Sequence, residues 1–244
     1  MDNSLLVSLS QQMASFQSMD VIANNIANVS TPGYRREQPT FQEYVTQLPG
    51  DDGTMQDVSF VQDTGIVRDM SQGPLTQTGN AFDLALKGKG FFVVQTPNGE
   101  RYTRNGHFAL DQQGQIVDDN GDPLMGDGGA ITITTDDGDV HVGADGTVSG
   151  KNGQLAKLRL AAFADESHLE KQGQNMFSSA DQPTTATDAT IAQGMIEGSN
   201  VQPVVEISRM VEVMRAYQAT ASMTQSQEDL IRQAIDKLGT IPNS

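Results

Sequence analysis

The chain of 244 residues carries 15 Lys and Arg against 31 Asp and Glu, which gives a formal net charge of −16, and it contains no Cys. This acidity argues against nucleic acid or an anionic membrane surface as a partner, and the lack of Cys excludes disulfides, zinc–thiolate sites and thiol catalysis. No apolar run approaches the roughly 18 residues of a membrane-spanning helix, and Met1–Ser4 lacks the basic start of a cleaved secretion signal.

Residues 1–33 are predicted to form an N-terminal helix. The pattern ends at Ser30-Thr31-Pro32-Gly33, where Pro32 also keeps Thr31 out of the α region. Apolar residues recur in steps of three or four, which is helical spacing. They are Leu6, Leu9, Met13, Phe16, Met19, Ile22, Ile26 and Val29.

Residues 34–74 show little periodicity and contain Pro39, Pro49, Gly50, Gly53 and Gly65. We expect an extended connector here, with room for one hairpin.

Residues 75–192 are predicted to form a β-rich central domain. Short runs such as Phe91–Gln95 favour strands, and Asn-Gly or Asp-Gly pairs between such runs are strong hairpin signals. Turns are expected at Pro97-Asn98-Gly99, Asn105-Gly106, Asn120-Gly121, Asp137-Gly138, Asp145-Gly146 and Asn152-Gly153.

Residues 193–244 are predicted to form a C-terminal helix that stops at Gly239 and Pro242. Its apolar positions form an a/d seam of about four heptads, which needs another helix to cover it. Thr224 and Glu228 weaken this seam. Its members are Ile207, Met210, Met214, Tyr217, Ala221, Thr224, Glu228, Ile231, Ile235 and Leu238.

The predicted fold class is therefore α+β. The N- and C-terminal helices pair as a coiled-coil-like domain, and the all-β domain is inserted between them. The charge is distributed in the same way, because residues 1–34 carry −2 and residues 201–244 carry −1, which leaves −13 for residues 35–200. Nearly neutral ends suit close packing, and an acidic centre suits a hydrated layer.

No catalytic, cofactor or metal site is expected. His107, His141 and His168 form no metal-ligand pair, and Gly88-Lys89-Gly90 lacks the spacing of a phosphate-binding loop. Residues 105–150 hold nine Asp and no Lys or Arg, nearly all beside turn residues, so turn capping is favoured over an acid–base pair. Calcium binding at Asp118–Asp122 is the alternative for that segment.

Three blocks resemble the bacterial flagellar axial proteins of the rod and hook. ANNIANVSTPGY (Ala23–Tyr34) is similar to their N-terminal motif, Phe82–Gly126 resembles the core of their β domain, and Gln193–Gly239 resembles their C-terminal helix with its leading turn. The positions expected to carry this motif or the assembly are Ala23, Asn24, Asn25, Ile26, Ala27, Asn28, Thr31, Pro32, Gly33, Tyr34, Glu197, Ser199, Asn200, Met210, Met214, Tyr217, Ile231, Ile235 and Leu238.

The resemblance implies a structural subunit of the flagellar rod that assembles helically through its terminal helices and transmits torque for motility. It implies copies of itself, other rod proteins and the flagellar type III export apparatus as partners. It also implies a location in the rod, in the periplasmic space, after export without a cleaved signal peptide. The chain length and the wording EGSNVQPV (Glu197–Val204) favour a proximal rod subunit over a distal rod or hook-type subunit. Alternatives from other classes are a secreted β-rich binding protein and an enzyme acting on cell-wall glycan.

Overall fold

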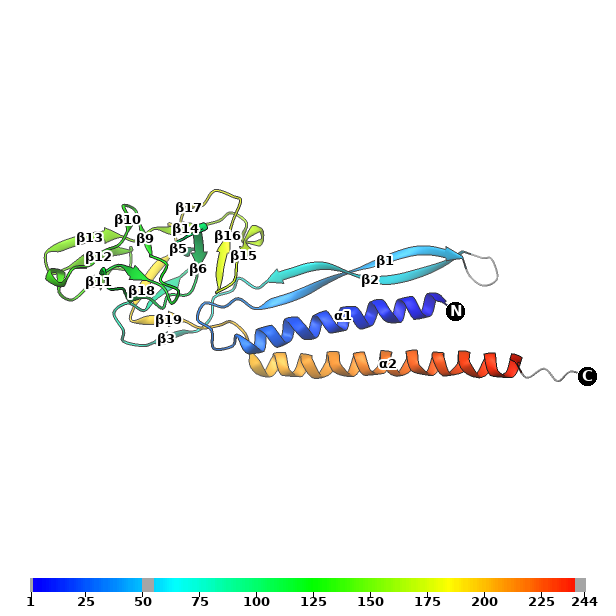
Figure 1. The fold of residues 1–244 in the computed structure, drawn as a ribbon. Coiled ribbons are helices and arrows are strands. Elements are labelled where there is room, and N and C mark those ends of the chain that lie inside the picture. The colour runs from blue at the N-terminus through cyan, green and yellow to red at the C-terminus, as the bar shows by residue number, and fades with distance from the viewer. Residues whose placement is uncertain (1, 50–54, 240–244) are drawn as a thin grey trace, which may run out of the picture. The chain divides into compact units, whose positions relative to one another are not determined.

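The computed structural model describes residues 2–49 and 55–239, and in the order of the chain one long helix precedes the β strands and another follows them (Figure 1). This confirms the predicted α+β class. Among the described residues, no helix is both long and apolar enough to cross a membrane.

The chain forms two compact units, which we call the helical unit and the β unit. The helical unit consists of Met1–Ala27, Glu37–Val67 and Gln202–Ser244. The β unit consists of Asn28–Arg36 and Arg68–Val201.

The helical unit contains two helices and one hairpin. Helix α1 (Asp2–Ala27) runs antiparallel to α2 (Pro203–Gly239) and packs along it (Figure 1). Strands β1 (Glu37–Pro49) and β2 (Met55–Arg68) pair as a two-stranded sheet, and β1 also packs against α1. The segment expected as an extended connector therefore contains a long hairpin.

Both helices are shorter than predicted. Helix α1 ends at Ala27, because the following residues form turns in which the Thr31 N–H donates to the Asn28 carbonyl at 3.2 Å. Helix α2 begins at Pro203 rather than at residue 193, because the preceding residues pair as a strand. Pro suits the first helical position, where its missing N–H would have no partner in the helix.

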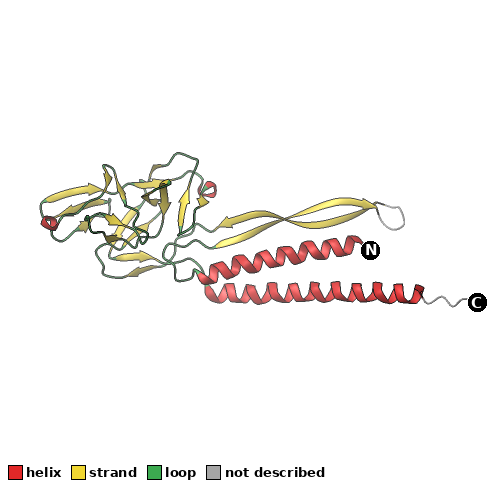
Figure 2. Ribbon diagram, viewed as in Figure 1, coloured by secondary structure: helices red, strands yellow, loops and turns green. Residues whose placement is uncertain are grey.

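The β unit consists mainly of short antiparallel strands (Figure 2). The largest sheet has six strands in the order β15-β16-β6-β5-β14-β17. The strands are β3 (Leu75–Gln77), β4 (Leu84–Lys87), β5 (Phe91–Thr96), β6 (Gly99–Thr103), β7 (Ala109–Leu110), β8 (Ile116–Val117), β9 (Met125–Gly126), β10 (Gly129–Ala130), β11 (His141–Val142), β12 (Thr147–Gly150), β13 (Gly153–Lys157), β14 (Leu160–Ala162), β15 (Glu170–Lys171), β16 (Met176–Ser178), β17 (Thr184–Thr185), β18 (Thr190–Gln193) and β19 (Met195–Glu197).

Strand β5 contributes side chains to both hydrophobic clusters of this unit. Successive side chains of a strand point to opposite faces. Phe92 and Val94 therefore belong to one cluster, and Phe91 and Val93 belong to the other. Burial on both faces explains why Phe91–Val94 are all apolar, whereas the half-buried Gln95 and Thr96 at the end of the strand are polar.

Most of the expected turns are present. Pro97-Asn98-Gly99 joins β5 to β6, Asp145-Gly146 lies between β11 and β12, and Asn152-Gly153 lies where β12 turns into β13. The hairpin expected at Asn105-Gly106 is wrong, because β6 pairs with β5 and β16 whereas β7 pairs with β8. A Cβ on Gly106 would lie 1.6 Å from the Leu84 carbonyl oxygen, so this glycine permits close backbone packing.

Candidate functional site

Asn25, from the predicted motif, is the polar centre of the helical unit. It is fully buried and bonds both backbone groups of Glu37, because Nδ2 donates to the carbonyl at 2.7 Å and Oδ1 accepts from the N–H at 2.9 Å. Nδ2 also donates to Oε2 of the buried Glu206 at 3.2 Å. One amide therefore joins α1, β1 and α2. Each of these buried groups would cost about 1–3 kcal/mol if left without its partner.

The remainder of the N-terminal motif is a turn within the β unit. Gly33 has φ +67°, and a Cβ there would lie 2.4 Å from the carbonyl carbon of Arg104, so no other residue fits without moving the backbone. The Gly33 N–H donates to the carbonyl of Glu197 at 2.8 Å. The Pro32 carbonyl accepts from Nδ2 of Asn175 at 2.6 Å. The turn is thus fixed at several points.

Asn200 holds the next residues of the same segment. Its Oδ1 accepts from the Arg36 N–H at 2.7 Å, and its Nδ2 donates to the Asp69 carbonyl at 2.8 Å. Its own N–H donates to the carbonyl of the buried Tyr34 at 3.4 Å. The two predicted motif blocks, far apart in sequence, therefore meet in one hydrogen-bonded cluster. Ser199 is buried beside it and accepts from the Val201 N–H at 3.2 Å.

Glu197 lies between two buried arginines. Its Oε1 is 2.8 Å from Nη1 of Arg35, and its Oε2 is 3.4 Å from Nη1 of Arg104. Oε1 also accepts from the Gly73 N–H at 2.9 Å. All three ionised side chains are at most 4% exposed, so the carboxylate neutralises charge that water cannot reach.

The cluster carries one more positive than negative charge. Burial, together with the neighbouring Arg35 guanidinium, lowers the pKa of Arg104 from its usual value. Among the described side chains, Nε and Nη2 of Arg35 and Nε of Arg104 are buried without a hydrogen-bond partner. Arg104 also lies over the Phe91 ring, with Cζ 5.2 Å from the centroid, which offsets part of this cost.

Helix α2 uses only part of the predicted stripe as its less exposed side. The buried and half-buried residues of the helix are Glu206, Arg209, Met210, Val213, Tyr217, Thr220, Ala221, Thr224, Gln227 and Ile231. Five residues of the predicted seam are half-buried, whereas Met214 and Ile235 are 44% and 62% exposed. The five are Met210, Tyr217, Ala221, Thr224 and Ile231. Leu238 lies outside the residues whose side chains are described. Buried Glu206, bound to Asn25, sets the rotation of the helix.

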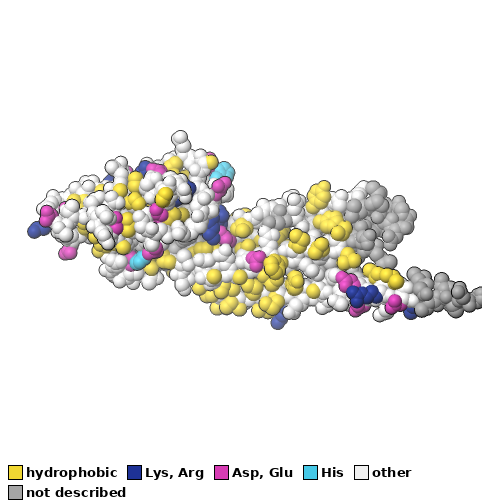
Figure 3. Space-filling view, viewed as in Figure 1, with side chains coloured by type: hydrophobic (Ala, Val, Ile, Leu, Met, Phe, Trp, Pro, Cys, Tyr) yellow, Lys and Arg dark blue, Asp and Glu magenta, His cyan; other side chains and the backbone are white. Residues whose placement is uncertain are grey.

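Helix α1 likewise turns its N-terminal apolar stripe outward. Leu6, Leu9, Met13 and Phe16 were expected to pair with the C-terminal helix, but each is between 48% and 66% exposed. Figure 3 shows hydrophobic side chains spread over the surface of the helical unit. The seam instead includes polar contacts, such as Gln12 Nε2 to Thr224 Oγ1 at 3.4 Å. We call these four residues the α1 outer stripe.

The other predicted motif residues are exposed or only half-buried. Ala23, Asn24 and Ala27 are exposed on α1, whereas Ile26, Asn28 and Thr31 are half-buried. Sequence reasoning missed Arg35, Glu37, Arg104 and Glu206. Charged residues are usually solvated, so the only available signal was that Arg35 directly follows the motif.

The acidic turn at Asp118–Asp122 is capped by its own first residue. Asp118 is 8% exposed, and its Oδ1 accepts from the N–H groups of Asn120 and Asp122, each at 2.9 Å. In the described part of the chain, no group of three or more His, Asp or Glu side chains is placed to hold a metal.

The chain matches three family models in order. They are the flagella basal body rod protein at residues 5–35, the flagellar hook protein FlgE/F/G D1 domain at 85–150, and the flagellar basal body rod FlgEFG protein C-terminal region at 192–237.

Curated relatives align along nearly the whole chain. The flagellar basal-body rod protein FlgF of Caulobacter vibrioides is 43% identical over 99% of this chain and 100% of its own length. FlgF of Mesorhizobium japonicum is 34% identical over 98% of this chain and 99% of its own length. The rod protein FlgG of Bacillus subtilis is 30% identical over 92% of this chain and 95% of its own length. This family is structural, not enzymatic. The chain belongs to the family of flagellar basal-body rod proteins and is a structural rod subunit of the flagellum.

Proposed function

We propose that the chain assembles into the rod through the outward apolar faces of its two helices. The observation that carries this proposal is the α1 outer stripe, which leaves Leu6, Leu9, Met13 and Phe16 in water. Helix α2 presents a second such face, with Val204, Ile207, Val211 and Met214 exposed. Apolar residues at helical spacing on a surface indicate a contact with another helix.

The energy available from this surface is substantial. Fully burying a Leu, Met or Phe side chain contributes about 1.5–3 kcal/mol. Because the four residues are roughly half exposed, covering them contributes about 1 kcal/mol each, or about 4 kcal/mol for the stripe. Because every copy carries this stripe, each contact between copies in the assembly gains this free energy.

The two outer faces belong to different helices, which supports a heterologous contact. Such contacts build an open helical array when the rotation does not close. A helical rod of this kind transmits torque through many equal contacts. The nearly neutral helical ends can be desolvated at low cost, whereas the acidic centre favours a hydrated outer position.

In this proposal the predicted segments 1–33 and 193–244 have the axial role, 34–74 connects them to the centre, and 75–192 is the outer domain. The motif residues Asn25, Gly33, Tyr34, Glu197 and Asn200 hold each unit in the form that assembles. Met214 and Ile235 are contact residues, and Met210, Tyr217 and Ile231 stabilise the helix pair.

We further propose a place in the proximal rod, within the periplasmic space, with other rod proteins and copies of this chain as neighbours. The chain length and the sequence Glu197–Val204 resemble the proximal rod protein FlgF. The identity of 43% to FlgF of Caulobacter vibrioides, against 30% to FlgG of Bacillus subtilis, supports this place over a distal rod or hook-type position. Export through the flagellar type III apparatus, without a cleaved signal peptide, completes the proposal.

Substitution of the outer stripe tests the assembly. Phe16→Asp places a charge at an exposed position, so the isolated chain should keep its thermal transition, while cells carrying it should lose motility. Gln11→Asp, at an exposed polar position of the same helix, is the matched control and should swim normally. Normal swimming of the Phe16→Asp strain would refute the proposal.

A further inference from the structure

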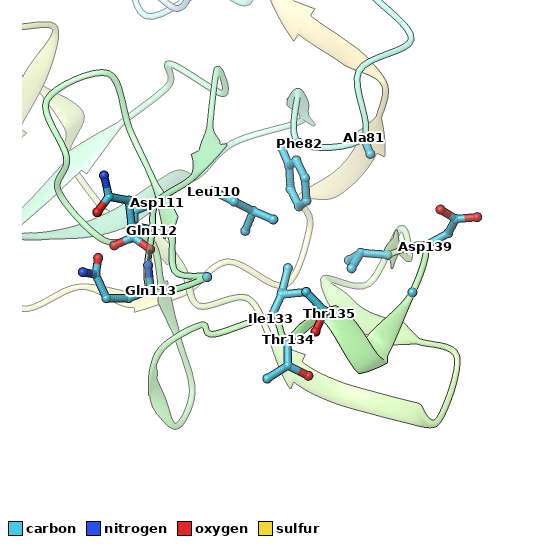
Figure 4. Close-up of a pocket in the computed structure, with 13 residues that line it drawn as sticks. Ala81, Phe82, Leu110, Asp111, Gln112, Gln113, Ile133, Thr134, Thr135 and Asp139 are labelled. Atoms are coloured by element: carbon cyan, nitrogen blue, oxygen red, sulfur yellow. Dashed lines mark hydrogen bonds between the residues drawn. The ribbon is translucent and has the colours of Figure 1, made fainter.

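A hollow of about 560 Å³ opens on the β unit (Figure 4), and no residue of the motif cluster lines it. Its walls are the turn at Asp111–Gly114, the segment from Ile133 to Val140, and Ala81 with Phe82. Nothing in the proposed assembly contact uses these residues.

Hydrogen bonds fix both walls of the hollow. Oδ1 of Asp111 accepts from the N–H groups of Gln113 and Gln115 at 2.9 and 2.7 Å. On the other wall, Oδ2 of Asp137 accepts from the Thr134 N–H and hydroxyl at 2.8 and 2.7 Å. The shape is therefore formed before any partner arrives, which limits the entropy lost on binding.

Apolar side chains converge in the hollow. In Figure 4, Leu110, Phe82 and Ile133 point toward one another across it. Leu110 is 40% exposed, and Phe82 and Val140 are partly buried and pack against the core cluster. A firm apolar floor beneath partly exposed Leu and Phe suits one inserted apolar side chain.

The rim of the hollow is acidic. Asp139 stands at the edge of the hollow in Figure 4, is exposed, and accepts no hydrogen bond from the described residues. Asp111 lies on the opposite wall. Residues 105–150 hold nine Asp and neither Lys nor Arg. Lys151 follows directly, and its N–H donates to the Asp137 carbonyl at 2.7 Å beside this wall, but its side chain does not line the hollow. A partner that carries Lys or Arg beside its inserted apolar side chain would therefore bind more tightly.

We propose that this hollow is a docking site for a basic segment of another protein, which inserts one apolar side chain between Leu110 and Phe82 and places Lys or Arg at Asp139 and Asp111. A second copy of this chain is a poor occupant. Residues 35–200 of a copy carry −13, and like charges facing each other oppose binding.

The probe is a short synthetic peptide in which one leucine is flanked on both sides by arginines, titrated into the isotope-labelled full chain. NMR shifts should change at Leu110, Gln113, Thr134 and Asp139. Replacing the peptide leucine by serine should weaken binding about tenfold, which corresponds to burial of one apolar side chain. Replacing its arginines by glutamates should abolish binding.

Two variants of the chain make the test specific. Asp139→Asn should weaken peptide binding about threefold and reduce its salt dependence, whereas Asp127→Asn, at an exposed position outside the hollow, should leave both unchanged. Equal binding of the leucine and serine peptides, or shifts confined to other residues, would overturn the proposal. Shifts at the hollow caused only by raising the concentration of the chain would show that a second copy is the occupant, which also overturns it.

Discussion

Glu197→Gln should destabilise the β unit far more than any substitution of a surface carboxylate. The change keeps the shape of the side chain but removes the negative charge between Arg35 and Arg104. Both guanidinium groups then stay buried without a counter-charge, and they already contain three nitrogen atoms that lack hydrogen-bond partners among the described residues.

The expected loss follows from burial. Removing one partner of a buried ion pair costs about 3–5 kcal/mol, because the charge left behind cannot be solvated. Glu100→Gln is the matched control, since Glu100 pairs with Arg159 at a site where the two side chains are 39% and 37% exposed. An exposed pair contributes about 0–1 kcal/mol.

Calorimetry and urea unfolding of the full chain measure the difference. At about 2–4 °C per kcal/mol, the melting temperature of Glu197→Gln should fall by roughly 10 °C, and that of the control by less than about 4 °C. Hydrogen exchange in β5 and β6 reports directly on the β unit. Equal, small losses in the two variants would refute the view that Glu197 neutralises the arginine pair.

Three further predictions concern separate parts of the molecule. Asn25→Ala should destabilise the helical unit by about 2–3 kcal/mol, seen in urea unfolding, because it leaves buried backbone groups of β1 unpaired. Asp118→Ala should cost about 1–2 kcal/mol through loss of its cap, whereas Asp119→Asn should stay within about 0.5 kcal/mol, and added calcium should change neither melting curve. The hydrogen bond that Nδ1 of His168 donates to Asp181, together with the charge of Asp165, raises the pKa of His168 above 6.5. The stability that this pair contributes is therefore present at pH below 6.5 and is lost as the pH rises through the folded-state pKa. An NMR titration should find the raised pKa, and Asp181→Asn should lower it.

The sequence was sufficient for the class of fold and for most turns. Helical spacing identified both helices, and five of the six expected turn signals lie at turns or beside a short helix. It failed at Asn105-Gly106, where the glycine serves close packing against Leu84 rather than a hairpin. Such contacts between distant segments leave no local pattern.

The rotation of the helices could not be predicted for a related reason. Helix α2 has two neighbouring apolar stripes, and spacing alone cannot say which one faces α1. The choice depends on Glu206, a charged residue that becomes buried because Asn25 binds it. The motif located Asn25, Gly33 and Asn200, but their partners appear only when the chain is folded.

Cysteine labelling of the outer stripe tests the assembly most directly, and the chain has no Cys of its own to interfere. Phe16→Cys and Asp119→Cys, both at exposed positions, should react equally with a maleimide in the isolated chain. In intact basal bodies, Phe16→Cys should be protected while Asp119→Cys still reacts. Equal labelling of both positions in basal bodies would contradict assembly through the α1 outer stripe.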